Sequence, residues 1–284
     1  LQKFAYAKYA VLVCAVLALF QSMAANALPG VVIHTLESRY GLTSVETGMI
    51  GAGYEIASTL GVLVIIRYIG KLSAMKCMSI GTLIFALGCF IFVLPQFLYG
   101  MYDPGKNGEI ISQFGNKWLI FFLGTALNGL GSIPSNVLFF TYFDENVERK
   151  KVPIYHSIGS IGSFLGALCG FLFGSAMLDL PVDFYRSDDG VVSEKKNDNV
   201  DDQHFVGAWW LPWLITGISM VFVSLILWPF PTELMDKRRK LELETDEDCD
   251  ESYKPTNSSS KSNSISKSTH VYKKVLNNPT WRST

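Results

Sequence analysis

Charged residues are scarce in this sequence. Only 17% of the 284 residues are Asp, Glu, Lys or Arg, and 49% are hydrophobic, whereas a soluble domain carries about 25% charged residues. The net charge is −1, and the sequence has no basic stretch with interleaved aromatic residues, which argues against nucleic acid as a partner. The composition instead points to the lipid bilayer as the surroundings of most of the chain.

Cysteine pairs and catalytic motifs are also lacking. The five cysteines form no C-x-x-C pair, so the sequence predicts neither a zinc site nor a disulfide framework. The four histidines show no metal-ligand spacing, and the sequence contains no phosphate-binding loop, H-E-x-x-H motif or serine-hydrolase motif. We therefore expect a protein that is not an enzyme and has no metal and no cofactor.

Long apolar runs are what the sequence does contain. Six of them approach the roughly 20 residues that a helix needs to cross a bilayer. The runs are continuous rather than alternating, which favours helices over barrel strands. We predict an all-α membrane protein whose six transmembrane helices occupy residues 1–230. The expected spans lie near residues 4–28, 48–67, 74–98, 118–142, 154–178 and 207–229.

The composition changes after the sixth run. Residues 242–250 are mostly acidic, and residues 257–269 are rich in Ser, Lys and Asn. Such a segment cannot bury enough apolar surface to fold. We expect residues 231–275 to form a disordered polar loop, and residues 276–284 to lead into a further helix.

The basic residues in the connections between runs predict the orientation. One set of connections is richer in Lys and Arg close to the helix ends, and the positive-inside rule places it in the cytoplasm together with both ends of the chain. The richer set contains Arg67, Lys71, Lys76, Arg149, Lys150, Lys151, Lys237, Arg238, Arg239 and Lys240. The first loop of the opposite side is expected to hold Arg39.

Glu55 is the sharpest candidate for a functional residue. It lies inside the second apolar run, where a lone charge costs about 2.5–3.5 kcal/mol on insertion scales. Gly51, Glu55 and Thr59 are four residues apart and would form one stripe of a helix. A carboxylate in a transport pathway is one reading, and a structural carboxylate satisfied by a neighbouring helix is the other.

The fourth and first runs hold further polar candidates. Gly129, Gly131 and Pro134 predict a break in the fourth run, and interrupted helices often line transporter sites, although a passive kink is an equal alternative. Asn128 precedes this break and could bind a substrate. Similar polarity in the first run comes from Gln21 and Asn26.

The fifth run carries a stripe of glycines. Spacing by four stacks these residues on one helix face, so that a neighbouring backbone can approach closely. Tight packing is one interpretation, and a smooth face that slides during transport is a compatible second. The stripe consists of Gly162, Gly166, Gly170 and Gly174.

Residues 202–212 resemble the signature of the organic anion transporting polypeptide family, which lies where the third outer loop enters the sixth helix. Departures from the family pattern are His204, Phe205 and Pro212, where Arg, Trp and Gly are usual. The two tryptophans would place amphipathic rings at an outer membrane interface. The matching positions are Asp202, Val206, Gly207, Ala208, Trp209 and Trp210.

Other stretches are similar to the same family in the right order. Residues 36–40, 54–56, 142–147 and 276–279 resemble family segments beside the second, fourth and seventh helices. The resemblance implies a major-facilitator fold of twelve helices, of which this chain would hold the first six, with the carboxy-terminal six-helix half missing. It also implies sodium-independent transport of large amphipathic anions across the plasma membrane, such as steroid conjugates and bile-salt-like or thyroid-hormone-like solutes, with exchange against bicarbonate as one driving force.

Two departures from the family bear on this function. Gln96 stands where members often have a titratable histidine, and Asn128 stands where several have an arginine. No Lys or Arg remains in the middle of any run, so this half would offer an anion no mid-membrane base. A truncated membrane protein that does not transport and acts as an interaction partner is the alternative.

Overall fold

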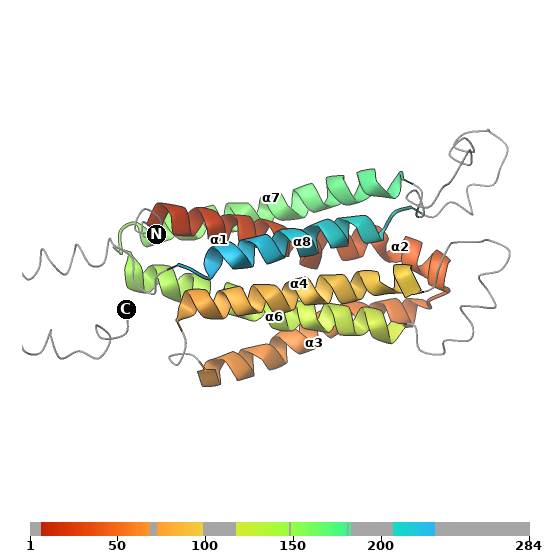
Figure 1. Cartoon of the computed structure of the whole chain (residues 1–284), viewed down its shortest axis with the longest axis horizontal. Coiled ribbons are helices and arrows are strands. Elements are labelled where there is room, and N and C mark those ends of the chain that lie inside the picture. The colour runs from red at the N-terminus through yellow and green to blue at the C-terminus, as the bar shows by residue number, and fades with distance from the viewer. Residues whose placement is uncertain are drawn as a thin grey trace, which may run out of the picture. The chain divides into compact units, whose positions relative to one another are not determined.

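Helices make up nearly all of the structure, a computed structural model that describes residues 7–68, 73–98, 118–147, 149–180, 182 and 207–230 (Figure 1). The predicted all-α fold is confirmed: six helical spans are long and apolar enough to cross a membrane. No strand occurs in these described ranges. Residues 231–284, and with them the predicted polar loop and lead-in segment, lie outside the described residues. The helices are α1 (Ala7–Ser22), η2 (Met23–Ala27), α2 (Leu28–Tyr40), α3 (Ser44–Tyr68), α4 (Ala74–Leu98), α6 (Trp118–Asn146), α7 (Val152–Leu178) and α8 (Trp210–Leu227).

The first span is longer than predicted and contains an irregular turn. It runs from Ala7 to Tyr40 through the π-helix η2, so the prediction that it ends near residue 28 and leaves Arg39 in a loop is wrong. Pro29 explains the turn, because it has no N–H and its ring clashes with the carbonyl four residues earlier. Short π-helical turns are frequent at functional sites.

A tight corner joins the first span to the second. Gly41 ends α2 in the left-handed conformation, with φ of 61°, which glycine adopts without steric cost. Thr43 and Glu46 then cap α3 reciprocally: Glu46 Nα donates to Thr43 Oγ1 at 3.4 Å, and Thr43 Nα donates to Glu46 Oε2 at 2.8 Å. This capping box fixes where α3 starts, and therefore the register of Glu55 within it.

Helix α4 occupies a central place, packed on both α6 and α8, while α3 lies along α6 and α1 lies along α7 (Figure 1). Small residues allow the close contacts. A Cβ on Gly131 would lie 2.8 Å from Phe85 Cα of α4, and one on Gly129 would lie 3.1 Å from Ser58 Nα of α3. The predicted break in the fourth run is wrong, because α6 continues through Pro134, while the alternative of a passive kink stays a prediction. The glycines of α6 serve helix contacts.

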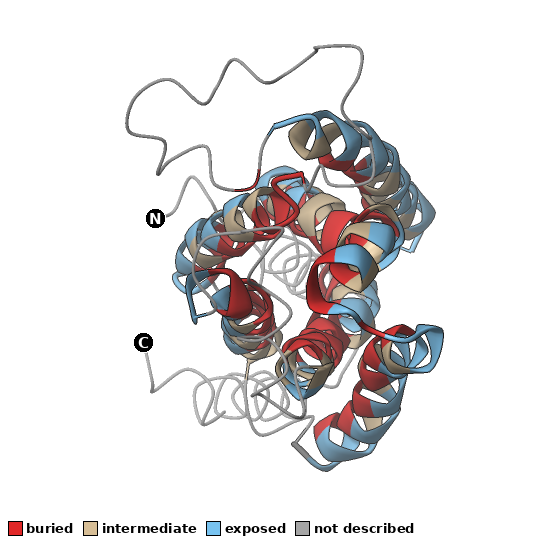
Figure 2. Cartoon of the chain, turned by 90° about the vertical axis from the view of Figure 1, so that its right-hand side faces the viewer, coloured by how far each residue is buried: buried red, intermediate tan, exposed pale blue. Residues whose placement is uncertain are grey.

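Burial divides each helix into two faces. The buried faces point toward the neighbouring helices, and the exposed faces point outward (Figure 2). The two spans with the least buried surface are α3 and α7. Large apolar side chains on them remain exposed, which marks surfaces for lipid or for further helices. Examples are Leu60, Leu63, Ile161, Phe164 and Leu172.

Candidate functional site

The main candidate site is a cavity of about 210 Å³, which we call the Glu55 cavity. Its walls come from the first span on one side and from α3, α4, α6 and α8 on the other. Carboxylate, amide and hydroxyl groups face the same space as several aromatic rings. The lining residues are Ala24, Ala25, Pro29, Gly30, Val32, Ile33, Leu36, Thr47, Ile50, Gly51, Tyr54, Glu55, Phe92, Thr125, Asn128 and Trp213.

The irregular turn of the first span forms part of this wall. Ala24 and Ala25 belong to η2, and Pro29 begins α2. The sequence predicts an interrupted helix in the fourth run, whereas the irregular turn lies in the first span, where none was predicted. The signal was present in Pro29, which is closely preceded by the polar Asn26.

Glu55 lines the cavity and is exposed in the described structure. The hydroxyls of Ser58 and Thr59 both donate to the backbone carbonyl of Glu55, at 2.9 Å. Of the expected polar stripe on α3, only the Glu55 side chain offers a polar group to the cavity. The Thr59 hydroxyl donates its hydrogen bond within the helix.

Asn128 reaches the same cavity from α6 and also contacts α4. It is 2% exposed, and its Oδ1 accepts a weak hydrogen bond from Cys89 Sγ at 3.7 Å. It packs against Gly88, where a Cβ would lie 2.8 Å from Asn128 Nα. The structure thus brings together Glu55 and Asn128, two candidates 73 residues apart in the sequence.

The other polar candidates lie elsewhere. Gln21 lines a separate cavity of about 80 Å³ that also contains Ser135 and Ser163. Asn26 donates its Nδ2 to Ser22 Oγ at 3.0 Å within the first span and does not line either cavity. Gln96 is fully buried near the end of α4 and is likewise absent from both cavity walls.

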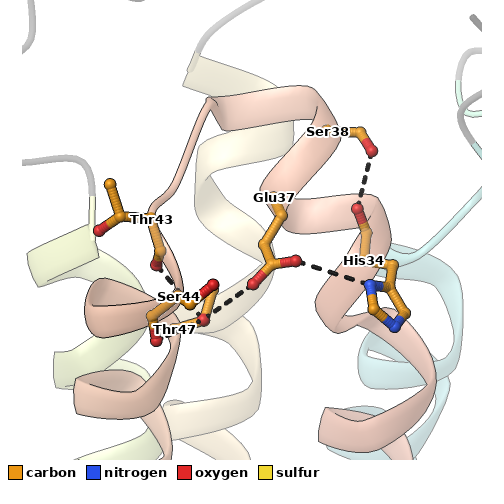
Figure 3. Close-up of polar contacts among 6 residues, drawn as sticks. All are labelled: His34, Glu37, Ser38, Thr43, Ser44 and Thr47. Atoms are coloured by element: carbon orange, nitrogen blue, oxygen red, sulfur yellow. Dashed lines mark hydrogen bonds and ion pairs between the residues drawn. The ribbon is translucent and has the colours of Figure 1, made fainter.

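A side-chain hydrogen bond joins α2 to α3 (Figure 3). Thr47 Oγ1 donates to Glu37 Oε1 at 3.0 Å, the shortest contact of that hydroxyl. Glu37 Oε2 lies 3.6 Å from His34 Nδ1, one turn earlier on α2. Because Thr47 lines the cavity, this contact fixes the separation of two cavity walls.

Replacing Thr47 with valine should weaken the contact between α2 and α3. Hydrogen bonds to charged groups contribute about 1.5–3 kcal/mol, and the partial exposure of Glu37 reduces this to roughly 1 kcal/mol. We expect a lower thermal stability of the purified full-length protein in detergent. Ser38→Ala is the control, because its hydroxyl only donates to the His34 carbonyl at an exposed site. Equal effects of the two changes would contradict the assignment.

The signature motif forms the entrance to α8. Ala208 Nα donates to the Leu180 carbonyl at 2.9 Å, and a Cβ on Gly207 would lie 2.7 Å from Leu178 Cα. Both contacts join the motif to the end of α7. Asp202 and Val206 lie outside the described residues.

The two tryptophans of the motif are buried inside the bundle rather than exposed on its surface. Trp209 is 0% exposed, and its ring lies 5.8 Å from Phe121 and 5.9 Å from Tyr40. Trp210 is 5% exposed and donates its Nε1 to the Val182 carbonyl at 3.0 Å. Aromatic rings of three helices surround Trp209, and Phe97 of α4 lies 5.8 Å from Trp210. The location of both rings at an outer membrane interface stays a prediction.

The glycine stripe of α7 lies against the first span over its whole length. Gly162 faces Ala15 and Gly166 faces Leu19, both at backbone level, and Gly170 faces Met23 of η2. Gly174 faces Val31 of α2, with a Cβ 3.3 Å from Val31 Cγ1. All four glycines are buried. The stripe is therefore the surface on which α7 meets the span that carries the irregular turn.

Titratable residues within the described ranges do not gather into metal sites. No group of three His, Cys, Asp or Glu side chains there could hold a metal ion. His156 Nε2 lies 3.6 Å from Asp144 Oδ1, which joins the start of α7 to the end of α6. The chemistry available in the Glu55 cavity is therefore ion pairing, hydrogen bonding and apolar contact.

Comparison with known families gives this site its context. The profile of the Organic Anion Transporter Polypeptide (OATP) family matches residues 9–283. The chain belongs to this family. The predicted family resemblance is thus confirmed, and the OATP chain is a multi-pass membrane protein, with six apolar helical spans among its described residues.

Individual relatives are named as members of the solute carrier organic anion transporter family. Solute carrier organic anion transporter family member 4A1 of Mus musculus is 29% identical over 236 residues, which are 77% of this chain and 32% of that protein. Member 4C1 of Homo sapiens is 28% identical over 75% of this chain and 30% of its own length. Member 1C1 of Homo sapiens is 26% identical over 71% and 33%. These relatives are named as transporters and not as enzymes.

A solved structure shows the same fold. A bacterial homologue of the human lysosomal transporter Spinster, in an inward-facing and occupied conformation, matches with a TM-score of 0.58 at 19% identity. The match covers 84% of this chain and 48% of that protein. The OATP chain therefore has one half of a major-facilitator-type fold, and it spans 30–33% of the length of the three relatives named above.

Proposed function

We propose that the full-length OATP carries large amphipathic organic anions across the plasma membrane without sodium, by alternating access. The amphipathic lining of the Glu55 cavity is the observation that supports this proposal. Ile33, Phe92 and Trp213 offer apolar surface, while Asn128 offers an amide group beside it. A solute with a large apolar body and few polar groups matches such a wall. Steroid conjugates and bile-salt-like or thyroid-hormone-like solutes have this character, and exchange against an anion such as bicarbonate would supply the driving force.

Alternating access requires a second half that moves relative to the first. The exposed apolar faces of α3 and α7 suit contact with lipid and with six further helices, and the Glu55 cavity borders α3. We propose that a carboxy-terminal six-helix half completes the substrate site. An anionic group of the substrate would find its positive partner there, or at residues nearer the membrane surface.

The orientation proposed from the sequence is compatible with the helix connections. Arg67 lies in the last turn of α3, Lys76 lies in the first turn of α4, and residues 149–151 join α6 to α7, so these basic residues lie at the same end of the bundle. Arg39, at the end of α2, lies at the opposite end. The positive-inside rule would place the richer end, and with it both ends of this chain, in the cytoplasm.

Uptake of a labelled steroid conjugate into cells that express the full-length protein tests the proposal. We expect saturable uptake that persists when external sodium is replaced by choline. Preloading the cells with bicarbonate should increase the initial rate if anion exchange drives transport. A protein that reaches the cell surface in normal amounts but takes up none of a broad panel of organic anions would contradict the proposal.

A further inference from the structure

The charge of the Glu55 cavity has one sign. Glu55 is the charged residue in its wall, and the remaining lining residues are apolar or carry neutral amide and hydroxyl groups. Arg39 is the basic residue of the adjoining helix α2, but it does not line the cavity, and its guanidinium lies 5.5 Å from the centre of the Tyr40 ring. A site that held the anionic end of a solute here would place two negative charges together.

Hydroxyl groups of the cavity wall, and those of the helical turn after Glu55, already donate hydrogen bonds to other acceptors. Thr47 donates to Glu37 at 3.0 Å, and Thr125 donates to the Ile50 carbonyl at 2.7 Å. Ser58 and Thr59 donate to the backbone carbonyl of Glu55 itself. In the described ranges, therefore, no side chain donates a hydrogen bond to the Glu55 carboxylate or forms an ion pair with it.

Aromatic rings also line the Glu55 cavity, and they suit the binding of a cation. Tyr54, Phe92 and Trp213 line the same cavity as Glu55, and the rings of Phe92 and Trp213 are stacked with their centres 4.1 Å apart. An ammonium group is attracted both to a carboxylate and to the faces of aromatic rings. Both kinds of group are present here, within a membrane-spanning helix bundle where a lone carboxylate is costly.

We propose that the Glu55 cavity binds the ammonium group of zwitterionic organic solutes, with the Glu55 carboxylate as its ion-pair partner. This inference rests on the proposed transport function and narrows its substrate class. Among amphipathic solutes that carry an anionic group, the transporter would prefer those that also carry an amine. The anionic end would then lie away from Glu55, on the side that the remaining helices complete.

Paired substrates test this proposal in cells that express the full-length protein. The pair is an iodothyronine, which carries both an ammonium and a carboxylate group, and its deaminated acid, which keeps the ring system and the carboxylate. Initial uptake rates would be measured for the wild type, Glu55→Gln, Glu55→Asp and Glu46→Gln, each normalised to the amount of protein at the cell surface. Glu46→Gln is the matched control, because Glu46 lies on the same helix in a capping box that glutamine can also form.

The proposal predicts a selective loss. Glu55→Gln should raise the KM for the iodothyronine roughly ten- to hundred-fold, the range expected for a charge-assisted hydrogen bond, and leave the deaminated acid unchanged. Glu55→Asp should retain the preference for the amine, and Glu46→Gln should change neither solute.

Other results would overturn it. Equal losses for both solutes in Glu55→Gln would indicate that Glu55 pairs with a cation of the remaining helices, and no loss for either solute would indicate a protonated or idle carboxylate. Uptake of neither solute by the wild type, with normal uptake of steroid conjugates, would reject the inference alone. Uptake of no organic anion at all would reject the proposed function and the inference with it.

Discussion

Replacing Trp209 with alanine should lower the free energy of unfolding of the protein by about 3–5 kcal/mol, the usual cost of truncating a large core aromatic residue. The side chain is fully buried and contacts Tyr40, Phe92 and Phe121 from three different helices, with ring centres 5.8–6.2 Å away. Its loss would leave a cavity where the first span, α4 and α6 meet α8. Edge-to-face contacts of this kind add about 0.5–1.5 kcal/mol per pair beyond area burial.

This loss can be measured as a drop in the melting temperature of the purified full-length protein in detergent, and as less protein at the cell surface. Trp228→Ala is the control, because Trp228 follows the same helix α8 but is 52% exposed. A similar melting temperature for both variants would contradict the assignment of Trp209 to the core. Trp209→Phe should recover part of the stability by refilling some of the volume.

Replacing Gly166 with alanine should prevent α7 from seating on the first span. A Cβ at this position would lie 2.8 Å from Leu19 Cα and 2.8 Å from the Leu19 carbonyl carbon. Because these are backbone atoms of a regular helix, a side-chain rotation cannot relieve the overlap, and the two helices must separate. Overpacking typically costs about 1–3 kcal/mol, and here the displacement would extend along the stripe to its neighbours Gly162 and Gly170.

The same thermal assay checks this prediction, together with uptake of a steroid conjugate. Gly48→Ala is the matched control, because a Cβ on Gly48 of α3 would meet no atom within 4 Å, and alanine in a helix is about 0.5–1 kcal/mol more favourable than glycine. We expect Gly48→Ala to be neutral or stabilising and Gly166→Ala to reduce both stability and surface amount. If Gly166→Ala were as stable as the control, the close approach of α7 to α1 would be wrong.

Wrong predictions for the first and fourth runs share one cause. The sequence predicts a helix break at Gly129, Gly131 and Pro134, yet α6 continues through them without interruption. The two glycines have no side chain, which allows the backbones of α3 and α4 to lie close to α6. The polar sequence around Glu37 and Arg39 suggested a loop, yet it continues the first span to Tyr40. In both places, packing against neighbouring helices determines whether the backbone stays helical, and local composition does not reveal that packing.

The candidate site was predictable in its members but not in its grouping. Glu55 and Asn128 were recognisable as polar residues inside apolar runs, and the structure places both in one cavity. Gln21, Asn26 and Gln96 are also polar residues inside apolar runs, but they lie outside that cavity. A polar residue within a span is a candidate for a functional or structural role. Which helix face it lies on, and which residues surround it, depends on how the helices pack.

The sequence alone determined that the part of the chain described by the structure contains six helices long and apolar enough to cross a membrane. It also determined membership of the organic anion transporter polypeptide family, because run length, low charge and the motif ending in Trp209 and Trp210 are local properties. The tertiary structure decided which of these residues meet. It enclosed both tryptophans in the core, brought α7 onto the first span through its glycines, and left the Glu55 carboxylate facing a cavity whose hydroxyl groups are used elsewhere. These outcomes depend on contacts between residues far apart in the chain, and such contacts follow from shape and close packing rather than from composition.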